Sequence, residues 1–125
     1  HPGMSIVTEV NGEGVRDKAM QAASDVLQGN PGLSGIFGIN DDSALGTLDA
    51  VRQFKREKII IVGYDATPPA VEAIRKNSAL KADVIQYPDR IGRNTIERIR
   101  DHFSGKAVPP VDPVEVGIVD ITTLK

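Results

Sequence analysis

The sequence contains no cysteine and no tryptophan, and only 4% of its 125 residues are aromatic. The absence of cysteine excludes disulfide bonds, thiolate metal sites and a thiol nucleophile. There is no run of about 18 apolar residues, so the sequence predicts no membrane-spanning helix. Neither sign of charge is in large excess, since 15 basic and 17 acidic residues give a net charge of −2. This balance argues against nucleic acid as a partner, because binding phosphates requires clustered positive charge.

In this sequence, runs of β-branched residues alternate regularly with segments in which apolar residues recur at the spacing of an α-helix. In residues 15–28, for example, apolar side chains recur every three or four positions, which predicts a helix with one buried face. Residues 58–63 (KIIIVG) form a continuous aliphatic run, which is typical of a central parallel strand covered on both faces. The expected strands are residues 5–10, 33–39, 58–63, 80–86 and 114–119, and the expected helices are residues 15–28, 42–54, 67–77 and 91–104.

This order of elements predicts an α/β fold built on an open, doubly wound parallel sheet. Parallel strands joined by short connections require helical crossovers, and such crossovers produce a Rossmann-like three-layer α/β/α arrangement. The length of 125 residues corresponds to about one domain. Only residues 108–113 (VPPVDP) have a linker-like composition, and a loop leading into the last strand is an equally good interpretation of them.

Polar side chains follow three successive strands of the predicted sheet. Asn40 follows the second expected strand, Tyr64 and Asp65 the third, and Gln86 the fourth. Ligands of open α/β sheets bind outside the carboxyl ends of the strands, so these side chains are expected to converge. Amide and carboxylate groups suit neighbouring hydroxyl groups, which both donate and accept hydrogen bonds. With Tyr64 offering an apolar face, the edge predicts a site for a small sugar or polyol.

Each of these residues also has a purely structural interpretation. Asp41 or Asp42 is expected to be the N-cap of the helix at residues 42–54. Asp65 would serve equally well in an Asx turn, Gln86 as a solvated loop residue, and Tyr64 as packing at the top of the core. The functional interpretation rests on their falling on one edge of the sheet.

Several kinds of chemistry are not indicated. The sequence has no G-x-G-x-x-G motif, no phosphate-binding P-loop and no G-x-S-x-G nucleophile elbow. The two histidines, His1 and His102, are far apart and lack metal-ligand spacing. We therefore expect no catalytic residue, no metal site and no cofactor, and an enzyme is not predicted.

Three segments of the chain match motifs that occur together in one protein family. Residues 37–46 (FGINDDSALG) resemble F-x-x-N-D-x-x-A-x-G, and residues 62–68 (VGYDATP) resemble V-G-[FY]-D-x-T-P. Residues 73–88 resemble A-I-x-x-G-x-L-x-A-T-x-x-Q-x-P. In this order, the three segments resemble the ribose-type periplasmic sugar-binding proteins. The last segment departs from the pattern, because Ser78 or Asn77 stands in place of the glycine and Asp83 stands in place of the threonine.

This resemblance implies the solute-binding component of an ABC importer, with the type I periplasmic binding protein fold. It implies that Asn40, Asp65 and Gln86 contact a pentose, hexose or related polyol, and that Tyr64 flanks it. The implied partners are the sugar and the membrane permease. The implied location is the periplasm, or an extracytoplasmic lipoprotein in a Gram-positive organism. The alternative is the effector-binding domain of a Lac-repressor-type transcription regulator, which uses the same fold.

The resemblance also implies an incomplete binding site. Members of the family have two lobes, and the matching motifs belong to the second half of such proteins. The chain is thus expected to be a C-terminal fragment that holds half the ligand site. Residues 1–86 would be the remainder of the C-terminal lobe, 87–110 a crossover helix segment, and 111–125 a return strand and tail.

The helix expected at residues 91–104 carries an apolar side that the family would cover with its N-terminal lobe. Leaving four large apolar side chains exposed forfeits about 1.5–3 kcal/mol for each of them. We therefore expect this helix either to fold back on its own sheet or to pack against a second copy of the chain. The four side chains are Ile91, Ile96, Ile99 and Phe103.

Overall fold

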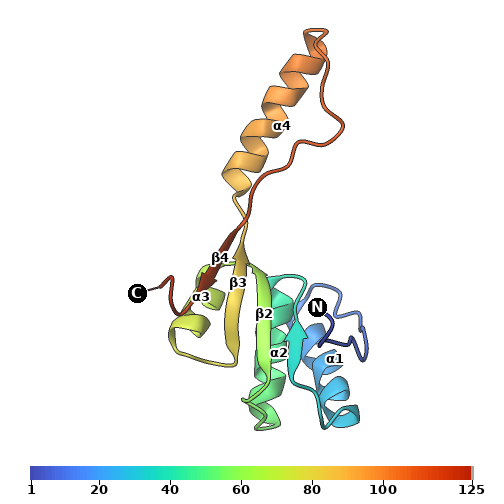
Figure 1. Cartoon of the computed structure of the whole chain (residues 1–125), viewed down its shortest axis with the longest axis vertical. Helices are drawn as coiled ribbons and strands as arrows, with labels where there is room; N and C mark the ends of the chain where they lie inside the picture. The colour runs from blue at the N-terminus through green and yellow to red at the C-terminus, as the bar shows by residue number, and fades with distance from the viewer. Residues whose placement is uncertain (125) are drawn as a thin grey trace.

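The computed structural model describes residues 1–124 and contains helices and strands in alternation (Figure 1). Apart from the N-terminal segment, the elements follow the order that the sequence predicts. In chain order they are α1 (Arg16–Gly29), β1 (Gly35–Phe37), α2 (Asp41–Gln53), β2 (Ile60–Asp65), α3 (Pro68–Arg75), β3 (Leu80–Ile85), α4 (Pro88–Phe103) and β4 (Gly117–Asp120).

The strands form one sheet in the order β1-β2-β3-β4. The pairs β1–β2 and β2–β3 are parallel, which confirms the α/β prediction, whereas β4 runs antiparallel to β3. The expectation of a parallel final strand is therefore wrong. The reason is visible in Figure 1, where α4 leads away from the sheet and the chain returns alongside it. A return of this kind, without a crossover over the sheet, brings the last strand back in the opposite direction.

The strand predicted at residues 5–10 does not form. All of these residues are exposed, and none pairs with another strand of the described chain. Their β-branched side chains give a preference for extended backbone, but a strand also needs a neighbour for its hydrogen bonds. The prediction is wrong because propensity alone does not supply that neighbour.

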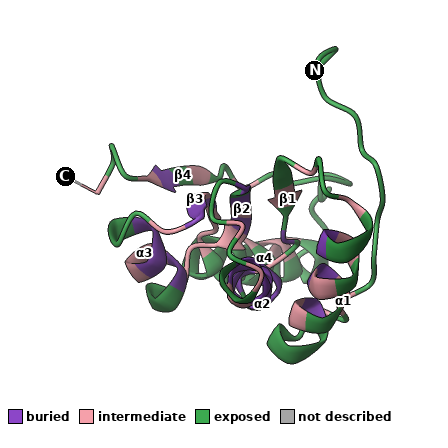
Figure 2. Ribbon diagram, turned by 90° about the horizontal axis from the view of Figure 1, so that it is seen from below, coloured by how far each residue is buried: buried purple, intermediate pink, exposed green. Residues whose placement is uncertain are grey.

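The core lies between the sheet and the helices α1, α2 and α3, which share one face of the sheet (Figure 2). Leu48 of α2, Ile61 of β2 and Ile74 of α3 are almost completely buried within it. Helix α1 packs mainly on α2, and its backbone approaches Gly46 so closely that a Cβ there would overlap the Arg16 carbonyl oxygen. The described chain thus has one layer of helices on one side of the strands, and the core lies between this layer and the sheet.

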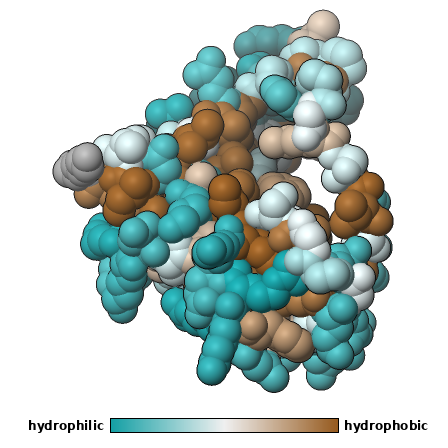
Figure 3. Space-filling model, turned by 60° about the horizontal axis from the view of Figure 1, so that its bottom comes forward, coloured by the Kyte–Doolittle hydropathy of each residue, from teal (hydrophilic) through white to brown (hydrophobic). Residues whose placement is uncertain are grey.

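The opposite face of the sheet is uncovered by the described residues. Phe37, Ile60 and Ile118 project from it with exposed fractions of 60%, 51% and 64%. In Figure 3, hydrophobic residues form a band across the side of the molecule in view. The expectation that both faces of residues 58–63 are covered is wrong here, because successive strand residues alternate and only Ile59, Ile61 and Gly63 lie on the helical side.

Helix α4 extends away from the sheet and, although described along its whole length, buries none of its residues (Figure 1). The expectation that it folds back on its own sheet is wrong. Pro88 begins the helix two residues after β3, and none of the helix residues is buried against the sheet. An ion pair of 2.7 Å from Arg98 to Asp112 joins α4 to the returning chain. Within residues 1–124 no helix is long and apolar enough to cross a membrane.

One guanidinium group fixes the connection between α1 and β1. Arg56 lies at the end of the turn after α2 and donates hydrogen bonds of 2.7–3.2 Å to four backbone carbonyls. A planar guanidinium can serve several acceptors in fixed directions, which a lysine ammonium cannot do. The acceptors are the carbonyl oxygens of Leu27, Asn30, Pro31 and Leu33.

Candidate functional site

Three polar side chains lie along the carboxyl-terminal edge of the parallel strands. Asn40 precedes α2 after β1, Asp65 is the last residue of β2, and Gln86 follows β3 directly. The strands β1, β2 and β3 are neighbours in that order, so their carboxyl ends are side by side. The structure therefore places the three residues on one edge, as the sequence predicts.

Asp65 and Gln86 are in direct contact. The Gln86 side-chain amide donates a hydrogen bond of 2.5 Å to Oδ1 of Asp65, and both residues are half-buried. Asp65 pairs in register with Ile85, which brings the next residue, Gln86, beside it. The contact leaves the second oxygen of Asp65 and the side-chain carbonyl of Gln86 for other partners. Two acceptors held side by side suit neighbouring hydroxyl groups.

Asn40 has a structural task at the same edge. Its side-chain oxygen accepts a hydrogen bond of 2.9 Å from the Ser43 backbone N–H, and its amide donates one of 3.0 Å to the Gly14 carbonyl. Asn40 is therefore the N-cap of α2, and the expectation of Asp41 or Asp42 there is wrong. The reason is backbone conformation, since Asn40 is extended as a cap requires, while Asp41 and Asp42 already belong to the helix.

Tyr64 lies on the uncovered face of the sheet. Side chains alternate along β2, and the preceding residue, Gly63, is buried on the helical side. Tyr64 pairs in register with Val84 and is half-buried. Its expected place beside a sugar ring stays a prediction.

The loop that follows Asp65 has an unusual backbone. Asp65 and Ala66 have φ angles of 126° and 55°, a region that residues with a Cβ rarely adopt. Such conformations cost about 1–3 kcal/mol each and persist only where surrounding contacts hold them. The conformation of this loop fixes how Asp65 is presented at the edge, so the contacts that hold it bear on the site.

Two buried carboxyl groups supply those contacts. Oδ2 of Asp41 accepts a hydrogen bond of 2.5 Å from the Thr67 N–H, and Oδ1 of Asp83 accepts one of 3.3 Å from the Ala66 N–H. The exposed fractions of Asp41 and Asp83 are 3% and 0%. Sequence reasoning missed this support, although a carboxylate inside the buried strand at residues 80–86 was a visible signal.

Asp83 holds its proton unusually strongly. Burial, followed by the neighbouring carboxyl group of Asp41, raises the pKa of Asp83 to about 7. Removing a carboxylate from water disfavours its charged form, and a second acid beside it has the same effect. Gly63 makes room for the group, because a Cβ at that position would lie 2.6 Å from Oδ2 of Asp83.

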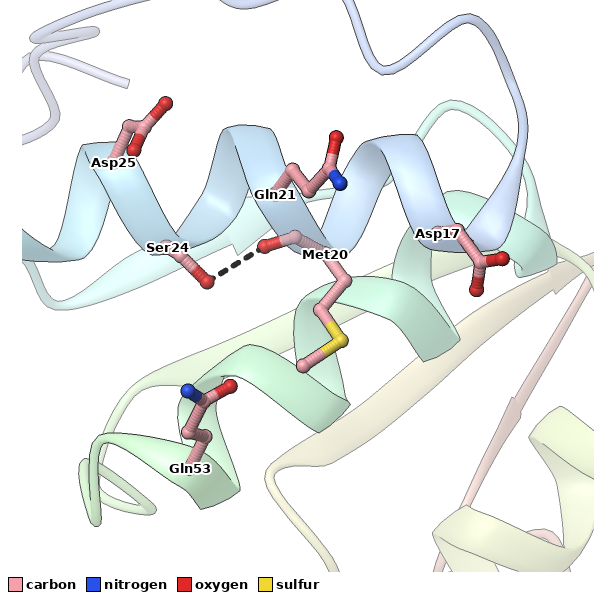
Figure 4. A pocket seen from close by; sticks show the side chains of 6 residues that line it. All are labelled: Asp17, Met20, Gln21, Ser24, Asp25 and Gln53. Atoms are coloured by element: carbon pink, nitrogen blue, oxygen red, sulfur yellow. Dashed lines mark hydrogen bonds between the residues drawn. The ribbon is translucent and has the colours of Figure 1, made fainter.

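Other concave surfaces lie elsewhere. A shallow groove of about 510 Å³ runs along α1 and the end of α2, and Figure 4 shows its lining. The one hydrogen bond drawn there joins the Ser24 hydroxyl to the Met20 carbonyl at 2.8 Å, within α1 itself. The lining residues are Asp17, Met20, Gln21, Ser24, Asp25 and Gln53, all from the helical layer. Within residues 1–124 no group of His, Cys, Asp and Glu is arranged to hold a metal ion.

Comparison with curated proteins finds sugar-binding proteins of importers. The chain is 32% identical over 105 residues to the ribose import binding protein of Bacillus subtilis, covering 84% of this chain and 34% of that protein. It is 35% identical over 107 residues to the D-allose-binding periplasmic protein of Escherichia coli, with the same shares covered. Both names describe sugar-binding proteins and not enzymes. The chain spans about a third of the length of these curated relatives.

Comparison with solved structures gives the same picture. A glucose-galactose binding protein from Geobacillus stearothermophilus superimposes with a TM-score of 0.91 at 27% identity, covering 98% of this chain and 44% of that one. An ABC transporter solute-binding protein from Mycobacterium smegmatis, solved with glycerol, gives a TM-score of 0.86 at 31% identity, covering 97% and 42%. These values confirm the fold class predicted from the sequence.

The family assignment follows from a match over most of the chain. The description of the matching family is "periplasmic binding protein domain", and the match extends over residues 1–107. It includes the edge with Asn40, Asp65 and Gln86 and the buried acids beneath it. The chain therefore belongs to the periplasmic binding protein domain family.

Proposed function

We propose that this chain supplies part of the sugar-binding site of an ABC importer's solute-binding protein. The observation that carries the proposal is the hydrogen-bonded pair of Asp65 and Gln86 at the carboxyl edge of a parallel sheet. With Asn40 on the same edge, the pair offers charged and neutral groups to the hydroxyls of a pentose, hexose or related polyol. Tyr64 is assigned the flanking position.

The similar proteins support a sugar as the ligand. The curated relatives are named for ribose and D-allose, and a solute-binding protein from Actinobacillus succinogenes was solved with bound D-allose. That structure is 26% identical and covers 98% of this chain. The second carboxylate oxygen of Asp65 and the Gln86 carbonyl would each accept from a hydroxyl, and hydrogen bonds to a carboxylate are about twice as strong as neutral ones.

The chain presents only one side of such a site. Residues 1–86 form the lobe portion, residues 87–110 a helix that would pack on another lobe, and residues 111–125 the return. A sugar bound at this edge would leave its other side in water. We therefore expect weak binding by this chain alone.

Transport also requires a membrane partner. The relatives are named as import and periplasmic binding proteins. We assign this chain the same class of partner, the membrane permease of an ABC transporter. The assigned location is extracytoplasmic, in the periplasm or on a Gram-positive cell as a lipoprotein.

We assign self-association to α4. The exposed fractions of Ile91, Ile96, Ile99 and Phe103 range from 41% to 85%. Pairing two such helices would remove this apolar area from water. Sedimentation should show a concentration-dependent dimer that is weakened by Ile96→Ser and unaffected by Glu97→Gln, an exposed change on the opposite side of the same helix. A monomer at every concentration would overturn this assignment.

The experiment for the sugar site is a titration followed by two-dimensional NMR. Adding ribose, D-allose or galactose in the high millimolar range should shift the signals of Asn40, Asp65 and Gln86. The variant Asp65→Asn should abolish these shifts, whereas Asp89→Asn, an exposed carboxylate in the first turn of α4, should retain them. No shift at the edge with any sugar would refute the sugar assignment, and micromolar affinity would refute the half-site.

A further inference from the structure

The buried acids Asp41 and Asp83 lie directly beneath the loop that presents Asp65. They come from different elements, since Asp41 is the first residue of α2 and Asp83 lies inside β3. Each uses one oxygen to accept a backbone N–H of the loop, from Thr67 and Ala66 respectively. Two carboxyl groups on separate elements thus hold consecutive residues of one strained loop.

The second carboxyl oxygen of each acid is buried without a hydrogen-bond partner within residues 1–124, which indicates that a proton lies between the two acids. Oδ1 of Asp41 and Oδ2 of Asp83 are buried and, among the described residues, accept no hydrogen bond. An unpaired buried charge is very costly, and a buried carboxylate normally accepts several hydrogen bonds. The two acids are neighbours, because the backbone N–H groups that they hold belong to consecutive residues and because the charge of Asp41 raises the pKa of Asp83. One proton between the two remaining oxygens would satisfy both and would remove one of two like charges.

Among the charged residues on the elements packed around Asp83, Asp41 is the one that faces it. Neighbouring strands present Gly63 of β2 and Val119 of β4 on the same face, by register and alternation. The other charged side chains of these elements are engaged elsewhere. They are Asp42, exposed on α2; Asp49 with Arg16 and Arg52; Asp65 with Gln86; Asp120 with Thr122 and Thr123; Glu72 with Arg75 and Lys76; and Lys81 with Asn77.

We propose that Asp41 and Asp83 form an acid pair sharing one proton, which Oδ2 of Asp83 donates to Oδ1 of Asp41, and that this pair sets the conformation of the Asp65–Thr67 loop. Asp83 is the member that carries the proton, because Asp41 lies in the first turn of α2, where the helix dipole favours negative charge. Both acids are positioning residues that act through Asp65. The inference rests on the proposed function only in taking Asp65 as a sugar contact.

The acid pair makes the loop sensitive to pH. While the proton is shared, both loop N–H groups keep their acceptors without repulsion beneath them. When the proton leaves, two buried carboxylates face each other, and the pair must separate or admit water. Burial and Asp41 raise the pKa of Asp83 to about 7, so this change falls near neutral pH. The loop would then release Asp65 from its position beside Gln86.

The testing experiment follows the loop itself, without sugar. In a pH titration of the chain between pH 5.5 and 8.5, the backbone amide signals of Ala66 and Thr67 should move together with a midpoint near pH 7. The side-chain carboxyl carbon of Asp83 should move with the same midpoint, a readout that needs no variant. A merely structural pair that never titrates would leave all three signals unchanged.

The matched variants are Asp83→Asn and Asp42→Asn. Asparagine keeps an oxygen for the Ala66 N–H and offers Asp41 a permanent donor, so the titration of the loop amides should disappear. Asp42 is exposed in the same helical turn, and its replacement should leave the titration unchanged. Static Ala66 and Thr67 signals in the unmodified chain, or an unchanged midpoint in Asp83→Asn, would overturn the proposal. These signals are read without ligand, so failure of the sugar titration described above remains a separate result.

Discussion

The free energy of unfolding should fall as the pH rises from 5 to 7, and Asp83 is the cause. In the folded chain Asp83 keeps its proton up to about pH 7, because burial and Asp41 raise its pKa from 3.8. The unfolded chain releases that proton near pH 4. Between these values the unfolded state binds fewer protons than the folded state, so stability decreases with rising pH and levels off above pH 7.

The size of this effect follows from the shift in pKa. The difference between about 7 and 3.8 is about three units, and each unit corresponds to about 1.4 kcal/mol. The whole change is therefore about 4 kcal/mol, of which about 2–3 kcal/mol falls between pH 5 and 7. Contacts lower the pKa values of Glu72, Asp101 and Asp120, so these groups add stability as the pH rises below about 5, outside this window.

The assay is urea denaturation followed by circular dichroism at pH 5, 6, 7 and 8. The unmodified chain should lose stability over this range, and Asp83→Asn should remove most of the slope. Asp42→Asn should retain the slope, because that carboxylate is exposed. A stability that is constant or increases from pH 5 to 7 in the unmodified chain would refute the reasoning.

Two further predictions concern the packing of α1. Arg56→Lys should cost about 1–3 kcal/mol, because an ammonium group cannot serve all four carbonyls. Thermal unfolding within 1 °C of the unmodified chain would contradict this. Gly46→Ala should also cost about 1–3 kcal/mol, since its Cβ would overlap the Arg16 carbonyl oxygen. Gly29→Ala is the control, with no heavy atom within 4 Å of the added Cβ, and equal melting temperatures for the two variants would refute the clash.

Much of the fold was accessible from the sequence because it depends on local patterns. The helical stripe at residues 15–28 and the aliphatic run at 58–63 correspond to α1 and β2. Gly and Pro residues between these patterns predicted the positions of the connections to within a few residues of those in the structure. The failures lie where an element needs a partner, as at residues 5–10, where β-branched side chains found no neighbouring strand.

The candidate site divides in the same way. The alternation of strands and helices was enough to place Asn40, Asp65 and Gln86 on one edge of the sheet. It did not show that Asn40 caps α2, because neighbouring residues in N-D-D are equally good caps by type. The contact between Asp65 and Gln86 depends on the register of β2 and β3, which strand patterns alone leave open.

The sequence by itself determined the α/β class and the resemblance to sugar-binding proteins. It also determined that polar residues follow three successive parallel strands. These features follow from side-chain periodicity and from motifs that are read along the chain. Only the tertiary structure decided that β4 is antiparallel, that one sheet face is uncovered, and that Asp41 meets Asp83. Those outcomes depend on which distant segments come together in space, and periodicity and motifs along the chain do not specify that.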